Sequence, residues 1–155
     1  MMIIFHLITI FAAYLYATFL EWAIHKHILH GLGKDKNSWF SFHWHSHHKN
    51  CKKYGNLDKS YDRLLSFPVR REILGLYVLV VIHLPIYFLL PYFYYTLIVC
   101  TLRYFYVHQK SHRDIKWAKK NIPWHYEHHM GKNQDSNWGV TTDIWDVILN
   151  TKRRQ

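Results

Sequence analysis

Two long apolar segments constrain the fold of this chain more than any other feature. Residues 3–24 hold one charged side chain, Glu21, and residues 73–107 hold one, Arg103. A helix over residues 3–24 would be about 33 Å long at about 1.5 Å per residue, enough to cross the apolar core of a bilayer. The sequence therefore predicts an all-α, integral membrane helical bundle.

The second apolar segment is too long for one span and slightly short for two. Pro91 is a plausible turn within it, so we expect a helical hairpin over residues 73–89 and 92–108 that is transmembrane or re-entrant. Neither half carries the polar stripe that core helices of a soluble domain usually show. A length of 155 residues fits one domain, which we place at residues 1–155.

The charge pattern predicts the orientation of the chain. Ten Lys and Arg residues lie in segment 25–72 and nine lie in segment 108–155, whereas none precedes Lys26. One long span plus a hairpin puts both basic segments on one face, and the positive-inside rule makes that face cytoplasmic. We expect the endoplasmic reticulum membrane in a eukaryote or the inner membrane in a bacterium. A nucleic-acid partner is not expected, because the net charge of +10 is explained by this topology.

Histidine is the unusual residue of the composition, with 14 copies, 12 of them in four short groups. The groups span residues 25–30, 43–48, 108–112 and 125–129, and each follows the end of an apolar segment or lies in a basic one. On a helix, residues three or four apart share a face. That spacing occurs within residues 43–48, 108–112 and 125–129. Within residues 43–48 it pairs His43 with His47.

The spacing of the histidines in residues 25–30 is less regular. His25 and His30 are five residues apart, so they converge only if the helix ends before His30, as Gly31 permits. His27 and His30 form a competing pair. We expect Glu21, one turn before His25, to accept a hydrogen bond from the ring of His25.

The number of histidines predicts two metal ions, because a single ion needs only about four ligands. Ten candidates supply about five nitrogens to each metal: His25, His30, His43, His47, His48, His108, His112, His125, His128 and His129. Iron, zinc, copper and nickel all accept such ligands. The lone His6 and His83 are expected to pack or hydrogen-bond within helices, and His27 and His45 to lie outside the ligand set.

The four groups together resemble the fatty acid hydroxylase/sterol desaturase superfamily of integral-membrane di-metal enzymes. The matching stretches are EWAIHKHILHG (21–31), HWHSHHK (43–49), HQKSH (108–112) and WHYEHHMGKNQDSNWGVTTDIWDVILNT (124–151). Asn150 stands where that family more often has Gly. The second stretch reads HxxxHH from His43 or HxHH from His45, so either histidine could be the ligand; helical spacing to His47 favours His43.

The resemblance implies a cytoplasmic, His-rich helical cap with a di-iron site that oxidises a lipid C–H bond with O₂. The ten histidines match ligand positions, and purified protein could carry zinc instead. No HPGG haem motif lies within the 155 residues, so we expect an external electron donor of the ferredoxin or cytochrome b5 type with its reductase. The substrate is expected to be a fatty acyl or sterol-like membrane lipid that passes Trp22, Trp39, Tyr104 or Phe105. The alternatives are a desaturase or carotenoid hydroxylase on the same site, or a non-catalytic His-rich protein that binds or transports metal.

Overall fold

The computed structural model describes residues 1–153, and this part of the chain folds into helices and connecting loops without β-strands. The long elements are α1 (Met2–Ala23), the π-helix η1 (Ile24–Leu32), α3 (Phe67–Ile82), α4 (Leu84–Tyr87) and α5 (Pro91–Ser111). The short elements are the π-helix η2 (His43–His48), α2 (Lys49–Lys53), the 3₁₀ helix η3 (Lys59–Asp62), α6 (Ile115–Asn121), α7 (Pro123–Met130) and α8 (Ile144–Ile148). The all-α class predicted from the sequence is confirmed.

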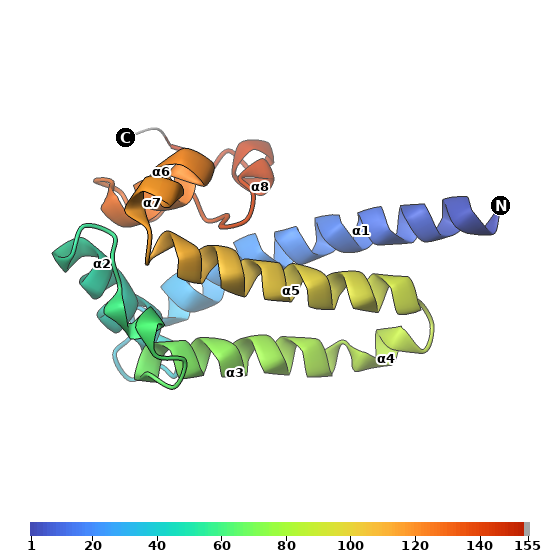
Figure 1. The fold of residues 1–155 in the computed structure, drawn as a ribbon, viewed down its shortest axis with the longest axis horizontal. Helices are drawn as coiled ribbons and strands as arrows, with labels where there is room; N and C mark the ends of the chain where they lie inside the picture. Colours follow the sequence, from blue (N-terminus) through green and yellow to red (C-terminus); the bar gives the residue numbers. More distant parts are fainter. Residues whose placement is uncertain (154–155) are drawn as a thin grey trace.

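Helices α1 and η1 form one continuous helix, Met2–Leu32, that is long and apolar enough to cross a membrane. Only 17% of its most apolar stretch is buried within the protein, so it is not the core helix of a soluble domain of this size. Figure 1 shows α1 projecting beyond its neighbours toward the N-terminus. The expected long helix over residues 3–24 is therefore present, although it continues eight residues further.

The expected hairpin is also present, with α3 and α4 running antiparallel to α5 (Figure 1). Its first arm begins at Phe67 rather than residue 73, because Pro68 at the first turn and the extended Ser66 favour a helix start there. The arm breaks at His83, two residues before Pro85, and resumes as α4. Leu90 leaves the helical region before Pro91, as residues before proline usually do, and α5 begins at Pro91.

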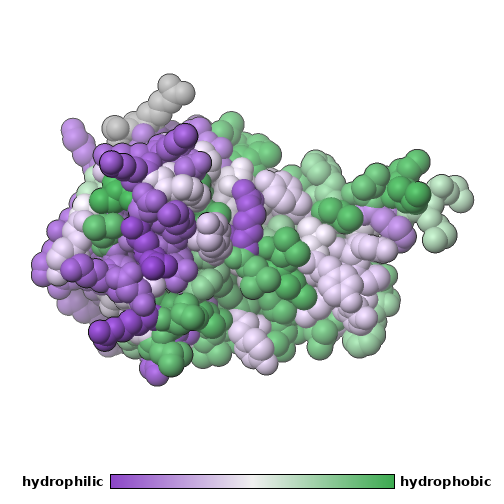
Figure 2. Space-filling view, viewed as in Figure 1, coloured by the Kyte–Doolittle hydropathy of each residue, from purple (hydrophilic) through white to green (hydrophobic). Residues whose placement is uncertain are grey.

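The surface of the molecule is divided into an apolar and a polar part. The outward side chains of the long helices include Phe11, Val99 and Leu102, each more than 60% exposed. Figure 2 shows mostly hydrophobic surface over the long helices and hydrophilic surface gathered over the opposite end. This segregation is typical of a protein whose long helices lie in lipid and whose other end lies in water.

The short helices η2, α2, α6, α7 and α8 form a cap over the end of the long helices, with η1 and the end of α5 beneath it (Figure 1). A small apolar core supports the cap, formed by Val107, Ile122 and Val140 with aromatic rings packed around them. Most of the large side chains with less than 2% exposure are histidines from this region. The interior of the cap is therefore a cluster of imidazoles rather than a conventional apolar core.

Candidate metal centre

All ten histidines predicted as ligands are buried, and four elements carry them into one region. Two come from η1, three from η2 and three from α7, while His108 lies in α5 and His112 caps the end of that helix. Their exposed fractions do not exceed 3%: His25, His30, His43, His47, His48, His108, His112, His125, His128 and His129. Segments up to a hundred residues apart in the sequence thus place their histidines together.

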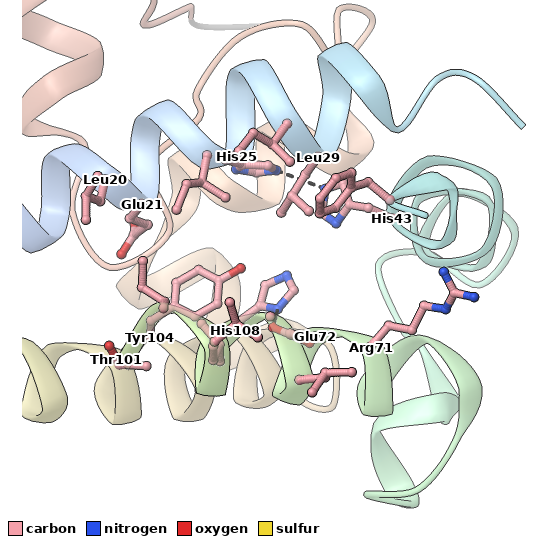
Figure 3. A pocket seen from close by; sticks show the side chains of 18 of the residues that line it. Leu20, Glu21, His25, Leu29, His43, Arg71, Glu72, Thr101, Tyr104 and His108 are labelled. Atoms are coloured by element: carbon pink, nitrogen blue, oxygen red, sulfur yellow. Dashed lines mark hydrogen bonds and ion pairs between the residues drawn. The ribbon is translucent and has the colours of Figure 1, made fainter. Parts of the chain in front are cut away.

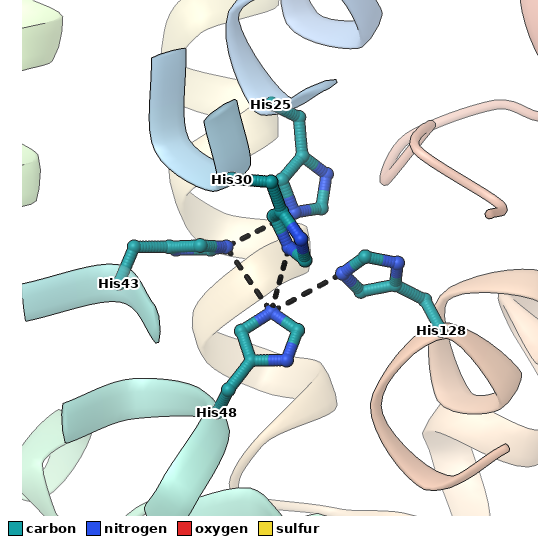
Figure 4. A group of neighbouring side chains, drawn as sticks. All are labelled: His25, His30, His43, His48 and His128. Carbon is teal, nitrogen blue, oxygen red and sulfur yellow. Dashed lines mark hydrogen bonds between the residues drawn. The ribbon is translucent and has the colours of Figure 1, made fainter. Parts of the chain in front are cut away.

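In space the ten histidines divide into two groups, which differ from the four sequence stretches. The first group contains five histidines, and Figure 4 shows their rings converging on a common centre. Their ligand atoms all lie within 4.8 Å of one another: His25, His30, His43, His48 and His128. The Nε2 atom of His48 lies 3.0 Å from that of His30, 3.2 Å from that of His43 and 3.2 Å from that of His128. His48 is therefore the central member of this group.

The second group contains His47, His108, His112 and His129, again with ligand atoms within 4.8 Å of one another. His125 adjoins it, because its Nε2 atom lies 3.2 Å from Nε2 of His112. The two groups together account for all ten candidates, five in each. The rings of His48 and His129 are 4.2 Å apart between centroids, so the groups are immediate neighbours.

The two π-helices explain which histidines share a group. A π-helix makes i→i+5 hydrogen bonds, so residues five apart lie close to one face. In η1 this brings His25 and His30 together, with ring centroids 5.1 Å apart. The expectation that the helix must end before His30 was wrong: the helix includes Gly31 and ends at Leu32, with Gly33 as its C-cap. The wider turn of the π-helix, not a helix end, brings the two rings together.

The same geometry in η2 changes the pairing expected from α-helical spacing. His43 and His48, five apart, belong to the first group, whereas His47 points into the second. His43 and His47 therefore lie beside each other, with ring centroids 5.3 Å apart, but belong to different groups. Helix α7 is also divided, because His128 joins the first group and its neighbour His129 the second. His108 of α5 and His112, which caps that helix, share the second group as α-helical spacing predicts, and so do His129 and the adjoining His125 of α7.

Hydrogen bonds to Nδ1 orient several of these rings. His25, His112 and His128 each pair through Nδ1 with a main-chain carbonyl, of Trp138 at 2.6 Å, Asn56 at 3.0 Å and Ser136 at 2.7 Å. A ring that donates from Nδ1 keeps Nε2 free of a proton and available to a metal ion. The outer contacts thus select one tautomer, with Nε2 directed into the groups.

Carboxylates orient two rings of the second group. Nδ1 of His47 donates to Oδ2 of Asp58 at 2.9 Å, and both side chains are buried. Nδ1 of His108 donates to Oε1 of Glu72 at 2.7 Å, and the hydroxyl of Tyr61 donates to Oε2 of Glu72 at 2.7 Å. Burial raises the pKa of Asp58, but hydrogen bonds from His47 and Ser60 outweigh it and lower this pKa to about 2. The carboxylate is therefore ionised beside His47.

A weaker acidic contact orients the first group. Asp135 lies 3.4 Å from Nδ1 of His30 and is half exposed, and it also accepts a hydrogen bond from Lys34 at 2.7 Å. Sequence reasoning did not identify Asp58, Glu72 or Asp135, because each is far from its histidine in the sequence. The position of Glu72, directly before the second apolar segment, was the one available signal.

The spacing of the imidazole nitrogens matches that of ligands around a metal ion. Nitrogens of two ligands bound to one ion at about 2.1 Å lie about 3.0–3.4 Å apart for ligand angles of 90–109°, and five of the Nε2 pairs lie 3.0–3.2 Å apart. The Nε2 atoms of His47, His108 and His129 are buried and have no hydrogen-bond partner within the described residues. Unpaired buried polar atoms facing a common centre are typical of a metal site.

Protonation does not stabilise these groups. Burial and the neighbouring imidazoles lower the pKa of His43, His48 and His129 well below the ordinary range, and burial lowers that of His128 to about 4. All four rings are therefore neutral near pH 7, the form that binds a metal ion.

The segment from Ser136 to Thr151 supports the first group from outside. Both carboxylate oxygens of Asp146 accept backbone N–H groups, from Trp138 at 2.9 Å and from Gly139 at 2.7 Å. This places the carbonyl of Trp138 against His25. Glu21 accepts hydrogen bonds from the backbone of Val140 and Thr141, not from His25. The expected Glu21–His25 contact was therefore wrong, since the carboxylate links α1 to this segment.

An apolar cavity of about 400 Å³ opens onto both groups between α1, α3 and α5 (Figure 3). His25 and His43 of the first group and His47 and His108 of the second line one part of it. The remaining wall is largely aliphatic and aromatic, and this volume lies within the range of small-molecule sites.

Two of the four aromatic residues expected beside the substrate line this cavity, namely Trp39 and Tyr104. Trp22 instead packs inside the protein and donates a hydrogen bond to Thr151 at 3.1 Å. Phe105 is not among the lining residues. Its helix, α5, presents Thr101, Tyr104 and His108 to the cavity.

The other four histidines lie outside both groups. His45 hydrogen-bonds to the carbonyl of Lys34 at 2.9 Å, and His27 is exposed. Of the lone histidines, His83 contacts the hydroxyl of Tyr16 at 2.9 Å and His6 packs against the ring of Tyr92. The structure thus places His43, and not His45, in the first group, and His25, not His27, beside His30.

Comparison with known sequences gives one family. The family model described as fatty acid hydroxylase matches residues 10–151, which include both histidine groups, the hairpin and most of α1. Comparisons with curated proteins and with solved structures give no match. Because the matched region covers most of the sequence, the chain belongs to the fatty acid hydroxylase family.

Proposed function

We propose that this protein is a membrane-bound di-iron oxygenase that hydroxylates a C–H bond of a lipid, of fatty acyl or sterol-like chemistry, with O₂ and electrons from a separate donor protein. The observation that carries the proposal is the apolar cavity, which reaches both histidine groups. An apolar substrate in this cavity would contact the histidines that would hold the metals. Membership of the fatty acid hydroxylase family supports the same class of reaction.

Each group would hold one iron ion. The first would use His25, His30, His43, His48 and His128, and the second His47, His108, His112, His125 and His129. Iron bound at both groups supplies the oxidising power to break an unactivated C–H bond with O₂. Imidazole-rich sites also bind zinc, so purified protein can carry zinc and be inactive.

The side chains around the cavity would have three tasks. The aliphatic walls of α1, α3 and α5 exclude water and align the lipid parallel to the helices. Asp58 and Glu72 hold the Nδ1 protons of His47 and His108, which keeps Nε2 of both rings directed at the metal. Tyr61 donates to Glu72 and fixes the position of that carboxylate.

The apolar surface of the long helices supports a membrane arrangement. In this proposal α1 crosses the bilayer, the α3–α5 hairpin lies in it beside α1, and the cap faces the cytoplasm. The basic segments 25–72 and 108–155 would then lie on the cytoplasmic side, as the positive-inside rule requires. The cavity between the three helices would receive its substrate from the lipid phase. The membrane would be the endoplasmic reticulum in a eukaryote and the inner membrane in a bacterium.

The test is lipid mass spectrometry of cells that express the protein under ¹⁸O₂, compared with cells that express His48→Ala. His48 contacts three other histidines of the first group, so its loss should abolish the product. His45→Ala is the matched control, because this ring lies outside both groups. A new lipid heavier by one ¹⁸O atom supports hydroxylation, and one that lacks two hydrogens indicates desaturation instead. An unchanged lipid profile in iron-replete cells that contain a competent electron donor would contradict the proposal.

A further inference from the structure

Arg71 is a cation at one end of a largely apolar cavity, whose other charged lining side chains are Glu21, Glu72 and Arg103. It belongs to the first turns of α3, and its Nη1 atom donates to the carbonyl of Trp39 at 2.6 Å. The guanidinium carbon lies 4.8 Å from the ring centroid of Trp39 and 4.9 Å from that of Phe67. The side chain is thus held in place by one hydrogen bond and two aromatic contacts.

No carboxylate neutralises this charge within residues 1–153. The ion pairs of the described chain do not include Arg71. The nearest acid in the sequence, Glu72, instead accepts hydrogen bonds from Tyr61 and His108. A guanidinium has five N–H donors, and one of them is used by Trp39. The remaining donors form a natural site for an anionic oxygen group.

The position of Arg71 gives the cavity a direction. Figure 3 shows it beyond His43 and His108, at the opposite end of the cavity from Leu20 and Thr101. From Arg71 the cavity wall follows α3 through Leu79 to Ile82, which is about 16 Å of helix at about 1.5 Å per residue. The Arg71 end of the cavity therefore carries a fixed positive charge. The other end lies among the long helices, and there Glu21 and Arg103 are both hydrogen-bonded to the backbone of Thr141.

We infer that Arg71 binds the head group of the substrate, and that the substrate is an acyl chain that ends in an anionic oxygen group, a carboxylate or a phosphate. The inference rests on the function proposed above and names the chemistry that its cavity selects. The anionic group pairs with the guanidinium at the cap end, and the hydrocarbon chain passes the histidines and extends toward Ile82. Uncharged lipids lack the group that this arrangement recognises.

The test is equilibrium binding of radiolabelled oleate to the purified, zinc-loaded protein in a non-ionic detergent, with unlabelled competitors. Zinc-loaded protein makes the measurement independent of catalysis. We expect oleate to compete at least about tenfold better than its uncharged methyl ester, because a charge-assisted pair is lost in the ester. Dioleoyl phosphatidate serves as a second competitor: stronger competition than oleate identifies a phosphate head group, and weaker competition identifies a carboxylate.

Three variants make the result specific to Arg71. Arg71→Gln should remove the preference for the anion, and Arg71→Lys should retain part of it. Arg70→Gln is the matched control, because Arg70 is exposed and does not line the cavity. Bound zinc and helical content measured for each variant identify one that fails to fold, in which case Arg71→Lys carries the comparison. Equal affinity for oleate and its methyl ester in the wild type, or an equal effect of Arg70→Gln and Arg71→Gln, would overturn the inference. A failure of the proposed function would instead leave oleate binding intact and abolish only the oxidised product.

Discussion

The carboxylates behind the two histidine groups differ in a way that predicts unequal effects on metal binding. Asp58 is fully buried and accepts from Nδ1 of His47 at 2.9 Å. Asp135 is half exposed and lies 3.4 Å from Nδ1 of His30, which makes a longer and weaker hydrogen bond. We therefore expect Asp58→Asn to weaken metal binding at the second group and Asp135→Asn to change the first group little.

The magnitudes follow from burial. Replacing a residue that orients a metal-binding histidine typically lowers metal affinity about 10–100-fold, which is about 1.4–2.7 kcal/mol. Asp58 also accepts from Asn50 at 3.1 Å and from the backbone of Ser60 at 3.0 Å, so the site is rigid and cannot replace the carboxylate with water. An exposed ion pair contributes at most about 1 kcal/mol, less than about sixfold in affinity. The effect of Asp58→Asn should thus exceed that of Asp135→Asn by at least about twofold and by up to about 100-fold.

The assay is competition with a chromophoric zinc chelator on purified protein, which resolves two metal affinities. We expect Asp58→Asn to lower one of them by about 10–100-fold and Asp135→Asn to leave both within about sixfold of wild type. Total metal measured by elemental analysis confirms whether two ions are bound at saturation. An effect of Asp135→Asn equal to that of Asp58→Asn would refute the argument from burial and geometry, and unchanged affinities in both would refute the assignment of the second group as a metal site.

Three further predictions concern the same region. Replacing His43 with Ala should remove one of the two metals, while His45→Ala should retain both, as elemental analysis would reveal; the reverse pattern would exchange their roles. Gly33→Ala should destabilise the fold by about 1–3 kcal/mol or more, because a Cβ there would lie 2.0 Å from the carbonyl oxygen of Leu29. At Gly31 the atom nearest to an added Cβ would be 3.6 Å away, so Gly31→Ala should fold normally. A thermal unfolding assay compares the two variants. Burial lowers the pKa of His43, His48, His128 and His129 in the folded protein below the value of 6.5 for a free side chain. The unfolded chain therefore takes up protons first, so the free energy of unfolding of the metal-free protein should fall by about 1.4 kcal/mol per pH unit for each of these rings below pH 6.5, continuing to about pH 4 for His128. Unfolding midpoints that do not change between pH 7.5 and 5.5 would contradict this.

The large-scale arrangement was predictable because it depends on residue type along the chain. Apolar segments with one charged residue each predicted the long helix and the hairpin, and Pro91 predicted the turn of the hairpin. The start of the first hairpin arm was placed six residues too late. The apolar segment was taken to begin after the charged residues Arg70, Arg71 and Glu72, whereas the helix begins before them, at Phe67 and Pro68.

The composition of the candidate site was also predictable, since all ten chosen histidines lie in the two groups or beside them. Their division between the groups was not. It depends on the helix type of η1 and η2, and single-sequence patterns carry no reliable signal for a π-helix. The acidic partners were missed for a different reason: the contacts of Asp58 with His47 and of Glu72 with His108 join segments that the sequence does not place together.

The π-helices and the histidine groups depend on each other. A π-helix is rare and less favourable than an α-helix, so it persists where another interaction stabilises it. In η1 and η2 the residues brought together five apart are both histidines of the first group, and α-helical spacing would rotate one member of each pair away from it. A metal bound by His25, His30, His43 and His48 would therefore stabilise both π-helices at once, and the metal and the local helix type should form together during folding.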